Sequence, residues 1–484
     1  MKKSTRTFLF TFFVLLFLII TPLIIGYSQG YRIDWQNKTL AQTGALFLEP
    51  RPAPVELFLD GELERRSSFL FQNIFAGDLI PKIYHIEVKK EGYTSWEKNL
   101  DVIPKLVTEA RNIVLFPKQG SKEAVAIKTE VESFAFSPSG KYLALVGKGL
   151  IPKISIYATD SKKEVLTFTA PKTFSGYAVG DIQWNKNSSY FLFSLEKGRT
   201  KKWVSVDLTR DELTSIDISQ DIIKLEDFRE HTKKLYKPAI TQVAWSHDDS
   251  NKIFFVTNDN SNDHLLFSYN LSSKKLSKPL AYDVLKYSVK GNKILYISSV
   301  LYSINSLNPD TGHIRQISFS PILNIEKADS ITFLKNIKDP YVALLVDESL
   351  YILNTKTASL KKISGSVNEA MATNAGKKIL IIARDTLSVY WLQDIRIQPF
   401  RDAGDIKAIY TSSDKITDAI WFSKNNEYII FATADAIKAA ELDTRDKVNT
   451  STLFAKKAGK IFYNEKDETL YFLSDETVYS LLIK

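Results

Sequence analysis

The chain has 484 residues, no cysteine and a formal net charge of +9, from 64 Lys and Arg against 55 Asp and Glu. Without cysteine there is no disulfide framework, thiolate zinc site, cysteine nucleophile, iron–sulfur cluster or acylated lipoprotein anchor. The five histidines show no H-x-H or H-x3-H spacing, which argues against a histidine metal site. At about 150 residues per domain, the length suggests about three domains.

The chain begins with a basic stub and an apolar segment. Three basic residues lie within the first seven, and residues 8–25 carry no charge. As a helix, this segment spans about 27 Å, close to the hydrocarbon thickness of a bilayer. Because the basic residues come first, the positive-inside rule places the N-terminus in the cytoplasm and the rest of the chain outside. The residues of a possible interfacial belt follow: Tyr27, Tyr31 and Trp35.

A buried core helix and a cleaved signal peptide are the two alternatives for this segment. The apolar stretch exceeds the roughly 7–15 residues of a usual signal core, and no A-x-A-like site follows in residues 26–30. We therefore predict an uncleaved signal anchor over residues 1–30 and a polar tether over 31–43. The predicted location is the cytoplasmic membrane, with a single pass and the C-terminal domains extracytoplasmic.

Residues 44–117 change to short alternating runs that are typical of β-strands. The run 55–59 ends at Asp60-Gly61, a hairpin-type dipeptide. In the run 84–90, Tyr84, Ile86 and Val88 share one face, and His85 points the other way. The pattern predicts a small β-sandwich in which His85 is structural or faces solvent.

The order of these elements resembles the PEGA family, a short extracytoplasmic β module. The shared features are the strands at 44–50 and 114–115, Asp60-Gly61, Ala76-Gly77 and Gly92-Tyr93 with downstream Trp96. The tetrapeptide that names the family departs from its pattern and is Pro52-Ala53-Pro54-Val55. The resemblance implies a non-catalytic module next to a membrane anchor.

Residues 121–484 contain an internal repeat, in which an alternating strand ends in an aromatic residue before a Ser/Asn-rich turn. Clear copies lie at 131–145, 180–193, 240–250 and 416–431. Weaker ones lie at 284–307, 328–363 and 367–392, and a last one begins near 459. The predicted anchors are Phe136, Trp184, Trp245, Tyr287, Phe333, Met371, Trp421 and Phe462. Their mean spacing of about 47 residues is typical of four-stranded propeller blades, and we interpret the aromatic anchors as inter-blade core.

The last copy offers about three strands, so residues 124–128 are predicted to supply its missing outer strand and close the ring. This favours eight blades, and seven remain the alternative if the copy at 367–400 merges with a neighbour. The run 136–144, Phe-Ser-Pro-Ser-Gly-Lys-Tyr-Leu-Ala, resembles the TolB-type and WD-repeat-like propellers. No copy carries a Trp-Asp dipeptide, so the WD-repeat signature is missing. The predicted fold class is all-β throughout, apart from the N-terminal helix.

The sequence offers no catalytic motif: G-x-S-x-G, H-E-x-x-H, P-loop and G-x-G-x-x-G are all missing. The run 259–263 has calcium-loop spacing, but it lacks the loop glycine and has Asn270 at position twelve, so we interpret it as a hairpin tip. Residues 217–239 form a long insertion, either an amphipathic helix over one propeller face or a solvated loop, and are the best candidate for partner contact. We predict no catalytic, cofactor-binding or metal-binding residues.

The charge does not indicate nucleic-acid binding, because four of its nine units belong to residues 1–38 and no basic run interleaves with aromatic residues. The first hypothesis is a membrane-anchored binding or scaffold protein of a bacterial cell envelope, with a protein or a cell-wall glycan as its partner. The alternative is a propeller enzyme that acts on envelope glycans, with carboxylates in the central funnel. Converging acidic, His, Tyr or Arg side chains in the channel mouth would favour the enzyme.

Overall fold

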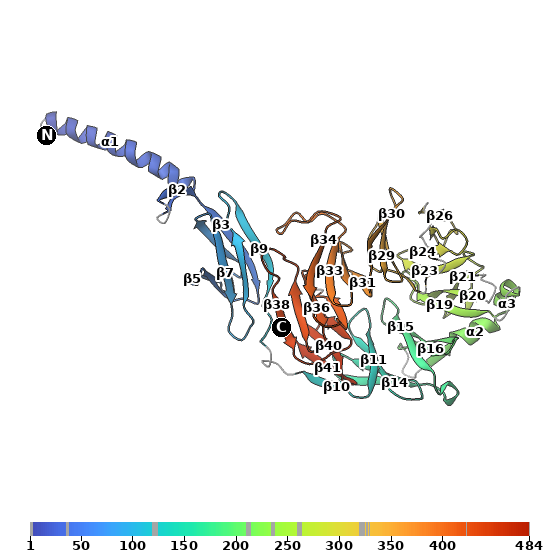
Figure 1. The fold of residues 1–484 in the computed structure, drawn as a ribbon. Helices are drawn as coiled ribbons and strands as arrows, with labels where there is room; N and C mark the ends of the chain where they lie inside the picture. The colour runs from blue at the N-terminus through green and yellow to red at the C-terminus, as the bar shows by residue number, and fades with distance from the viewer. Residues whose placement is uncertain are drawn as a thin grey trace.

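The computed structural model describes residues 3–34, 38–118, 124–209, 214–233, 238–258, 264–318, 325, 328, 330–422 and 424–483. One long helix precedes a small two-sheet unit, which is followed by a ring of four-stranded sheets (Figure 1). In its described residues the protein is therefore all-β, as the sequence predicts, apart from this helix, two short α-helices and the 3-10 turn Lys172–Phe174.

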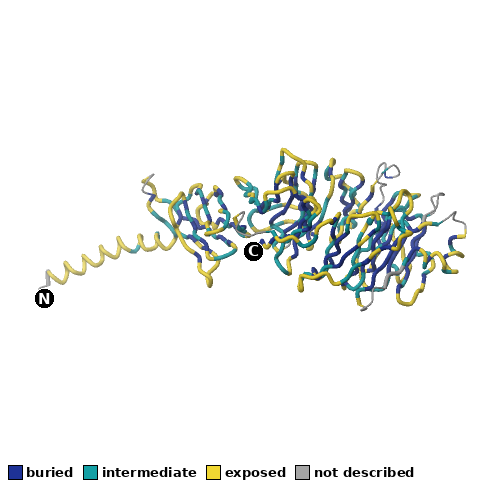
Figure 2. Tube along the Cα trace, turned by 90° about the horizontal axis from the view of Figure 1, so that it is seen from below, coloured by how far each residue is buried: buried dark blue, intermediate teal, exposed yellow. Residues whose placement is uncertain are grey.

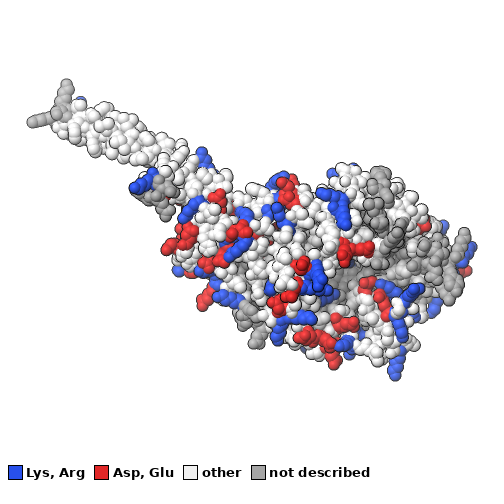
Figure 3. Space-filling model, in the orientation of Figure 1, with Lys and Arg blue, Asp and Glu red and all other residues white. Residues whose placement is uncertain are grey.

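Helix α1 (Lys3–Ser28) projects away from the rest of the chain (Figures 1 and 2). Its stretch Thr5–Ser28 has a mean hydropathy of 2.9, and none of its most apolar window is buried. Figure 3 shows the described part of α1 as an almost uncharged rod, whereas charges of both signs cover the other domains. By length and composition, α1 is sufficient to cross a bilayer.

The predicted tether contains a two-stranded hairpin, β1 (Tyr31–Asp34) and β2 (Thr39–Gln42), while Trp35 lies outside the described residues. Arg32 ties the hairpin to its neighbours: its guanidinium lies 3.6 Å from the centroid of the Tyr27 ring and donates to Asp78 at 2.8 Å. The pattern missed this hairpin because its two strands have only four residues each.

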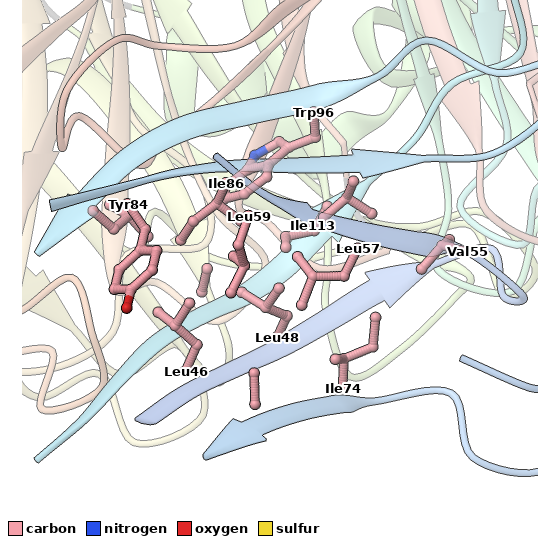
Figure 4. Packing of buried hydrophobic residues seen from close by; sticks show 14 of the residues in the cluster. Leu46, Leu48, Val55, Leu57, Leu59, Ile74, Tyr84, Ile86, Trp96 and Ile113 are labelled. Atoms are coloured by element: carbon pink, nitrogen blue, oxygen red, sulfur yellow. The ribbon is translucent and has the colours of Figure 1, made fainter. Parts of the chain in front are cut away.

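Seven strands then form a small β-sandwich, as predicted. One sheet has the order β6 (Ile74–Leu79), β3 (Gly44–Arg51) and β9 (Val107–Val114). The other has the order β5 (Glu62–Arg66), β4 (Glu56–Leu59), β7 (Ile83–Lys89) and β8 (Trp96–Asp101). Figure 4 shows their inner faces packed together by Leu46, Leu57, Ile86 and Trp96. Tyr84, Ile86 and Val88 are buried, as the alternation predicts, whereas His85 is on the other face, half-buried, and contacts Asn99.

Within the described residues, the remainder of the chain forms eight four-stranded sheets, here called blades 1 to 8. Blades 1 to 4 consist of β11–β14 (Val131–Phe136, Tyr142–Gly147, Lys153–Ala158, Lys163–Thr169), β15–β18 (Ala178–Trp184, Tyr190–Lys197, Thr200–Asp207, Thr214–Asp217), β19–β22 (Ala239–Trp245, Lys252–Asn258, Leu265–Asn270, Lys275–Leu276) and β23–β26 (Val284–Lys290, Lys293–Ser298, Ile304–Leu307, Ile314–Gln316). Blades 5 to 8 consist of β27–β30 (Ile331–Phe333, Tyr341–Val346, Ser349–Asn354, Ser359–Ser364), β31–β34 (Glu369–Ala372, Lys378–Ile382, Thr386–Trp391, Ile406–Thr411), β35–β38 (Asp418–Trp421, Tyr428–Ala432, Ile437–Glu441, Thr450–Phe454) and β39–β41 (Ile461–Asn464, Thr469–Ser474, Thr477–Leu482) with β10 (Val125–Lys128).

The ring closes through blade 8, where β10 is the outermost strand and pairs with β41. This is the strand that the sequence assigned to residues 124–128. Blade 8 in turn packs on blade 1, with the rings of Phe136 and Phe462 stacked at 4.2 Å. A buried apolar cluster lies between each described blade and the next around the whole ring. Each sheet thus covers its neighbour, which is how a propeller buries both faces of its blades.

The insertion at 217–239 is helical in its described part, with α2 (Ile218–Lys224) and α3 (Glu226–Thr232) between blades 2 and 3. Ile218, Ile222 and Phe228 are buried in the same cluster as Phe255 and Phe267 of blade 3. The amphipathic interpretation is therefore correct, and the apolar side of these helices belongs to the propeller core.

The sandwich is joined to blade 7 by buried polar contacts. The Lys98 ammonium pairs with the Glu441 carboxylate at 2.8 Å and donates to the carbonyls of Asp443 and Arg445 at 2.8 Å each. The Trp96 indole also donates to Glu441, at 2.8 Å, and the Asn449 amide does the same at 2.8 Å. We call Lys98, Trp96, Glu441 and Asn449 the clasp. It satisfies a buried charge on each side, so the two units are held in one orientation.

An apolar contact adjoins the clasp. Phe116, at the end of the sandwich, is buried against Phe422 and Tyr428 of blade 7, with ring centroids 5.9 and 5.6 Å away. The Tyr428 hydroxyl accepts from the Val114 N–H at 3.0 Å. Sandwich and propeller therefore share a core, and the domain boundary near residue 117 lies within packed structure.

Candidate functional site

A cavity of about 1470 Å³ occupies the middle of the ring. It is lined by the first strand of every blade and by the turns between first and second strands, which form its mouth. The volume exceeds the roughly 300–1,000 Å³ of small-molecule pockets, so the cavity has room for a segment of a larger ligand. It is the central funnel that the sequence analysis considered for either binding or catalysis.

Each blade places one residue at an equivalent position on the cavity wall. This is the residue of the first strand that pairs with the second residue of the second strand. We call this set the wall ring. In blades 1, 2, 3 and 7 these are the aromatic anchors that the repeat predicted, such as Trp245 opposite Ile253. In blades 4, 6 and 8 the register instead places Val289, Ala372 and Tyr463 there, opposite Ile294, Ile379 and Leu470.

In blades 4, 5, 6 and 8 the predicted anchor is therefore not the wall-ring residue. Tyr287 lies two residues before the wall-ring position, and Met371 and Phe462 lie one residue before it. In blade 5 the ladder stops at Phe333, and Lys335 takes the place on the cavity wall. The predicted anchors are large side chains, whereas the wall-ring position is defined by strand pairing and can hold a small residue.

The wall-ring positions differ between blades. They are aromatic in blades 7, 8, 1, 2 and 3 and are Val289, Lys335 and Ala372 in blades 4 to 6, where Tyr287 and Phe333 also line the cavity. The wall ring members are Phe136, Trp184, Trp245, Val289, Lys335, Ala372, Trp421 and Tyr463. The cavity wall thus carries aromatic side chains around most of the ring, with smaller wall-ring residues in blades 4 and 6.

Two tryptophans of the wall ring also join adjacent blades. The Trp245 indole donates to the Gln183 carbonyl of blade 2, and the Trp421 indole donates to the Met371 carbonyl of blade 6, each at 3.1 Å. The Trp184 indole nitrogen is buried and has no such partner in the described structure. The interpretation of the anchors as inter-blade core is thus correct, although they also face the cavity.

The mouth carries exposed cations from separate blades, Lys186, Lys335 and Lys466, together with Glu465. Away from the mouth, Lys201 also lines the cavity and pairs with Asp181 at 2.9 Å and with Glu196 at 2.8 Å. Burial lowers the pKa of Lys286, another lining lysine. The named lysines therefore outnumber the carboxylates in the mouth, whereas Lys201 is paired with carboxylates.

A second charged group lies where the first strands of blades 6, 7 and 8 begin. Burial raises the pKa of Asp418 to about 6, against the effect of the Ile461 and Ala419 N–H groups, which each donate to its carboxylate at 2.8 Å. Burial also raises the pKa of Glu369 and lowers that of Lys460. These three residues do not line the cavity described above.

Metal-ligating groups of three or more His, Cys, Asp or Glu were found nowhere in the described ranges. The calcium-like run 259–263 lies outside those ranges, between β20 and β21. Asn270 stands at position twelve of that run. Its side-chain oxygen accepts hydrogen bonds from the N–H groups of Ser272 and Ser273, at 3.1 and 2.9 Å, within a turn. Sequence reasoning missed Lys335 in the cavity mouth and Lys98 in the clasp. Lys98 had a signal, because it interrupts an apolar face between Trp96 and Leu100.

The closed ring of four-stranded sheets places the larger unit in the β-propeller class. No protein-family model matches the chain, and no curated protein matches it. The β-propeller domain of Myceliophteria thermophila Cps50 (Swd1) is 11% identical over 75% of this chain and 100% of that chain, with a TM-score of 0.43. The C-terminal WD40 domain of Sif2 is 12% identical over 75% of this chain and 99% of that chain, with a TM-score of 0.47.

Proposed function

We propose that this protein is a membrane-anchored binding or scaffold protein of a bacterial cell envelope. Helix α1 is its single-pass anchor, with the N-terminus in the cytoplasm, and a PEGA-like sandwich and the propeller lie outside. The ligand-binding site is the mouth of the central cavity, and the partner is an envelope protein or a cell-wall glycan.

The observation that carries this proposal is the clasp. A buried ion pair and a shared aromatic core hold the propeller on the sandwich. The sandwich in turn contacts the end of α1 through Arg32, which donates to the carbonyl of Tyr27 at 2.9 Å and to Asp78. A chain of fixed contacts from anchor to propeller suits a protein that presents a binding face at a set height and angle above a membrane.

The cavity supports binding because its mouth combines exposed cations with an aromatic wall. Aromatic rings provide large, rigid contact area, and loops on a rigid scaffold commonly carry recognition. The lysines come from blades 2, 5 and 8, so a ligand that contacts all of them must be centred on the propeller axis.

The alternative function is an enzyme that acts on envelope glycans. Asp418 and Glu369 favour it, since two carboxyl groups of raised pKa are suited to acid–base chemistry. The two functions differ in a simple assay: Asp418→Asn would abolish release of product from envelope glycans by an enzyme, and it would leave partner capture at the cavity mouth unchanged.

Photo-crosslinking in intact membranes tests the binding site. A photoreactive amino acid is placed at Lys335, in the cavity mouth of blade 5, or at Lys361, exposed on outer strand β30 of the same blade. We expect a discrete crosslinked species from position 335 and none from position 361. The same species from both positions, or from 361 alone, would contradict binding at the mouth.

A further inference from the structure

The juxtamembrane hairpin β1–β2 has an unusual distribution of side chains. Its inner face carries Asp34, which is buried, and Arg32, which binds Asp78 of the sandwich. Its outer face carries the cross-strand pair Ile33 and Leu40, which are 53% and 66% exposed. Ile33 and Leu40 thus place an adjacent pair of apolar side chains on the outer face, which suits contact with an apolar surface.

The hairpin is fixed beside the end of α1. The carbonyl of Gly30, two residues after the helix, accepts from both the N–H of Thr43 at 2.8 Å and its hydroxyl at 3.0 Å. The Gln42 side chain donates to the carbonyl of Gln29 at 2.9 Å. Both ends of the hairpin are therefore attached to the helix terminus, and its depth relative to α1 is set.

That depth coincides with the edge of a bilayer crossed by α1. The apolar stretch ends at Ile25, and the polar headgroup layer beyond the hydrocarbon is about 5–7 Å thick on each side. A hairpin with four-residue strands is about 13 Å long and begins at Tyr31, so it lies within or next to this layer. Figure 1 shows β2 beside the end of α1, on the side of the sandwich that faces the helix.

The polar groups of the hairpin fit the same environment. Lys38 is exposed in its turn, and the Arg32 guanidinium covers the ring of Tyr27, which is itself exposed at the end of α1. Aromatic rings with nearby basic groups are typical of the interface, where the ring meets the acyl boundary and the cation meets phosphate.

We infer that the outer face of the β1–β2 hairpin, with Ile33 and Leu40, is inserted in the interfacial layer of the bilayer that α1 crosses. The inference rests on the proposed membrane anchor and adds a second contact with the lipid. A helix alone leaves the outer domains free to rotate and tilt about one point. With the hairpin seated as well, the sandwich and the clasped propeller have a defined orientation to the membrane plane.

The test uses the full chain, which has no native cysteine, in vesicles of phosphatidylcholine and phosphatidylglycerol. Single variants Leu23→Cys in α1, Leu40→Cys in the hairpin and Leu70→Cys in the sandwich are labelled with an environment-sensitive nitrobenzoxadiazole dye. All three leucines are exposed, at 66%, 66% and 83%. Leu70 lies shortly before β6. The first residue of β6 pairs with Leu48, near the end of β3 that is away from α1, so Leu70 is the matched control. Lipids with a spin label near the headgroup serve as quenchers.

We expect blue-shifted emission and several-fold stronger quenching at position 40 than at position 70, together with an apolar environment at position 23. Labelling Ile33→Cys should give the result of position 40, which guards against a local effect of one substitution. Position 40 behaving like position 70, while position 23 lies in lipid, would overturn the hairpin insertion and leave the anchor intact. Position 23 outside lipid would overturn the membrane anchor itself.

Discussion

Lys98 of the sandwich and Glu441 of the propeller form an ion pair of 2.8 Å in which the two side chains are 0% and 5% exposed. Removing one partner of such a pair leaves an uncompensated buried charge, which costs about 3–5 kcal/mol. We therefore expect Lys98→Met to lower the thermal unfolding midpoint of the full chain in detergent and to loosen the sandwich from the propeller.

Lys447→Met is the matched control for this prediction, because Lys447 pairs with Glu97 at the same interface while both side chains are well exposed. An exposed pair contributes about 0–1 kcal/mol, so this variant should unfold near the parent. The double variant Lys98→Met/Glu441→Gln should regain part of the loss. Equal midpoints for the two single variants would refute the clasp.

Trp245 donates an inter-blade hydrogen bond, whereas within the described residues Trp184 at the equivalent position of blade 2 does not, so the two positions should differ in their tolerance of phenylalanine. Trp245→Phe removes a donor from the Gln183 carbonyl and should destabilise the propeller by about 1 kcal/mol more than Trp184→Phe, whose indole nitrogen has no partner in the described structure. Both variants lose similar ring area, so chemical denaturation of the pair isolates the hydrogen bond. A larger loss for Trp184→Phe would show that ring size, and not the indole bond, decides stability here.

Closure of the ring depends on a close approach between blades 8 and 1. Gly140 has φ +67°, and a Cβ there would lie 2.4 Å from Oδ1 of Asn464, whose amide donates to the Gly140 carbonyl. Gly140→Ala should therefore destabilise the protein by more than the roughly 1 kcal/mol expected for left-handed strain alone.

Gly312→Ala provides the comparison for the closure prediction, because Gly312 has φ +72° and open space around its Cβ position. The difference between the two thermal midpoints measures the clash at the closing contact. Hydrogen exchange should also rise in β10 and β41 for Gly140→Ala only. If both variants lost the same stability, the blade 8–blade 1 contact would not be close-packed.

The raised pKa of Asp418 should make the stability of the protein depend on pH. Because burial raises its pKa in the folded state to about 6, the folded protein binds more protons than the unfolded chain between about pH 4 and pH 6. Stability should therefore fall as the pH rises through this window and then level off. Glu369 acts in the same direction, since its pKa is raised too, whereas the lowered pKa of Lys460 acts only at alkaline pH.

Thermal midpoints of the parent and of Asp418→Asn across this pH window test the assignment. The variant should show a shallower slope and the greater relative stability near neutral pH. A slope unchanged by the substitution would assign the titration to another group.

Periodic features of the chain could be predicted from the sequence, because each rests on local alternation or repetition. The apolar helix, the buried face of Tyr84, Ile86 and Val88, and the closing strand at 124–128 are of this kind. Register in the weak repeats could not be predicted, since the wall-ring position depends on where each strand pair begins. Val289 and Ala372 therefore escaped notice, being too small to stand out in the pattern.

Contacts between segments that are far apart in the sequence could not be predicted from local sequence patterns either. Lys98 and Glu441 are 343 positions apart, and nothing local to Glu441 marks it as a partner. The hairpin in the predicted tether was missed because its four-residue strands are too short to show alternation, and its contacts with the end of α1 and with Asp78 leave no local signal. The candidate site was thus foreseen as a funnel, but the composition of its wall was not.

If α1 is the membrane anchor, the propeller lies outside the cytoplasm, and the two sides of α1 differ in their access to reagents. Since the chain has no native cysteine, Thr5→Cys before the apolar stretch and Ser161→Cys in the exposed β13–β14 turn each carry a single thiol. A membrane-impermeant maleimide applied to intact cells should label position 161 at once, and position 5 only after permeabilisation. Labelling of position 5 and protection of position 161 in intact cells would contradict the account.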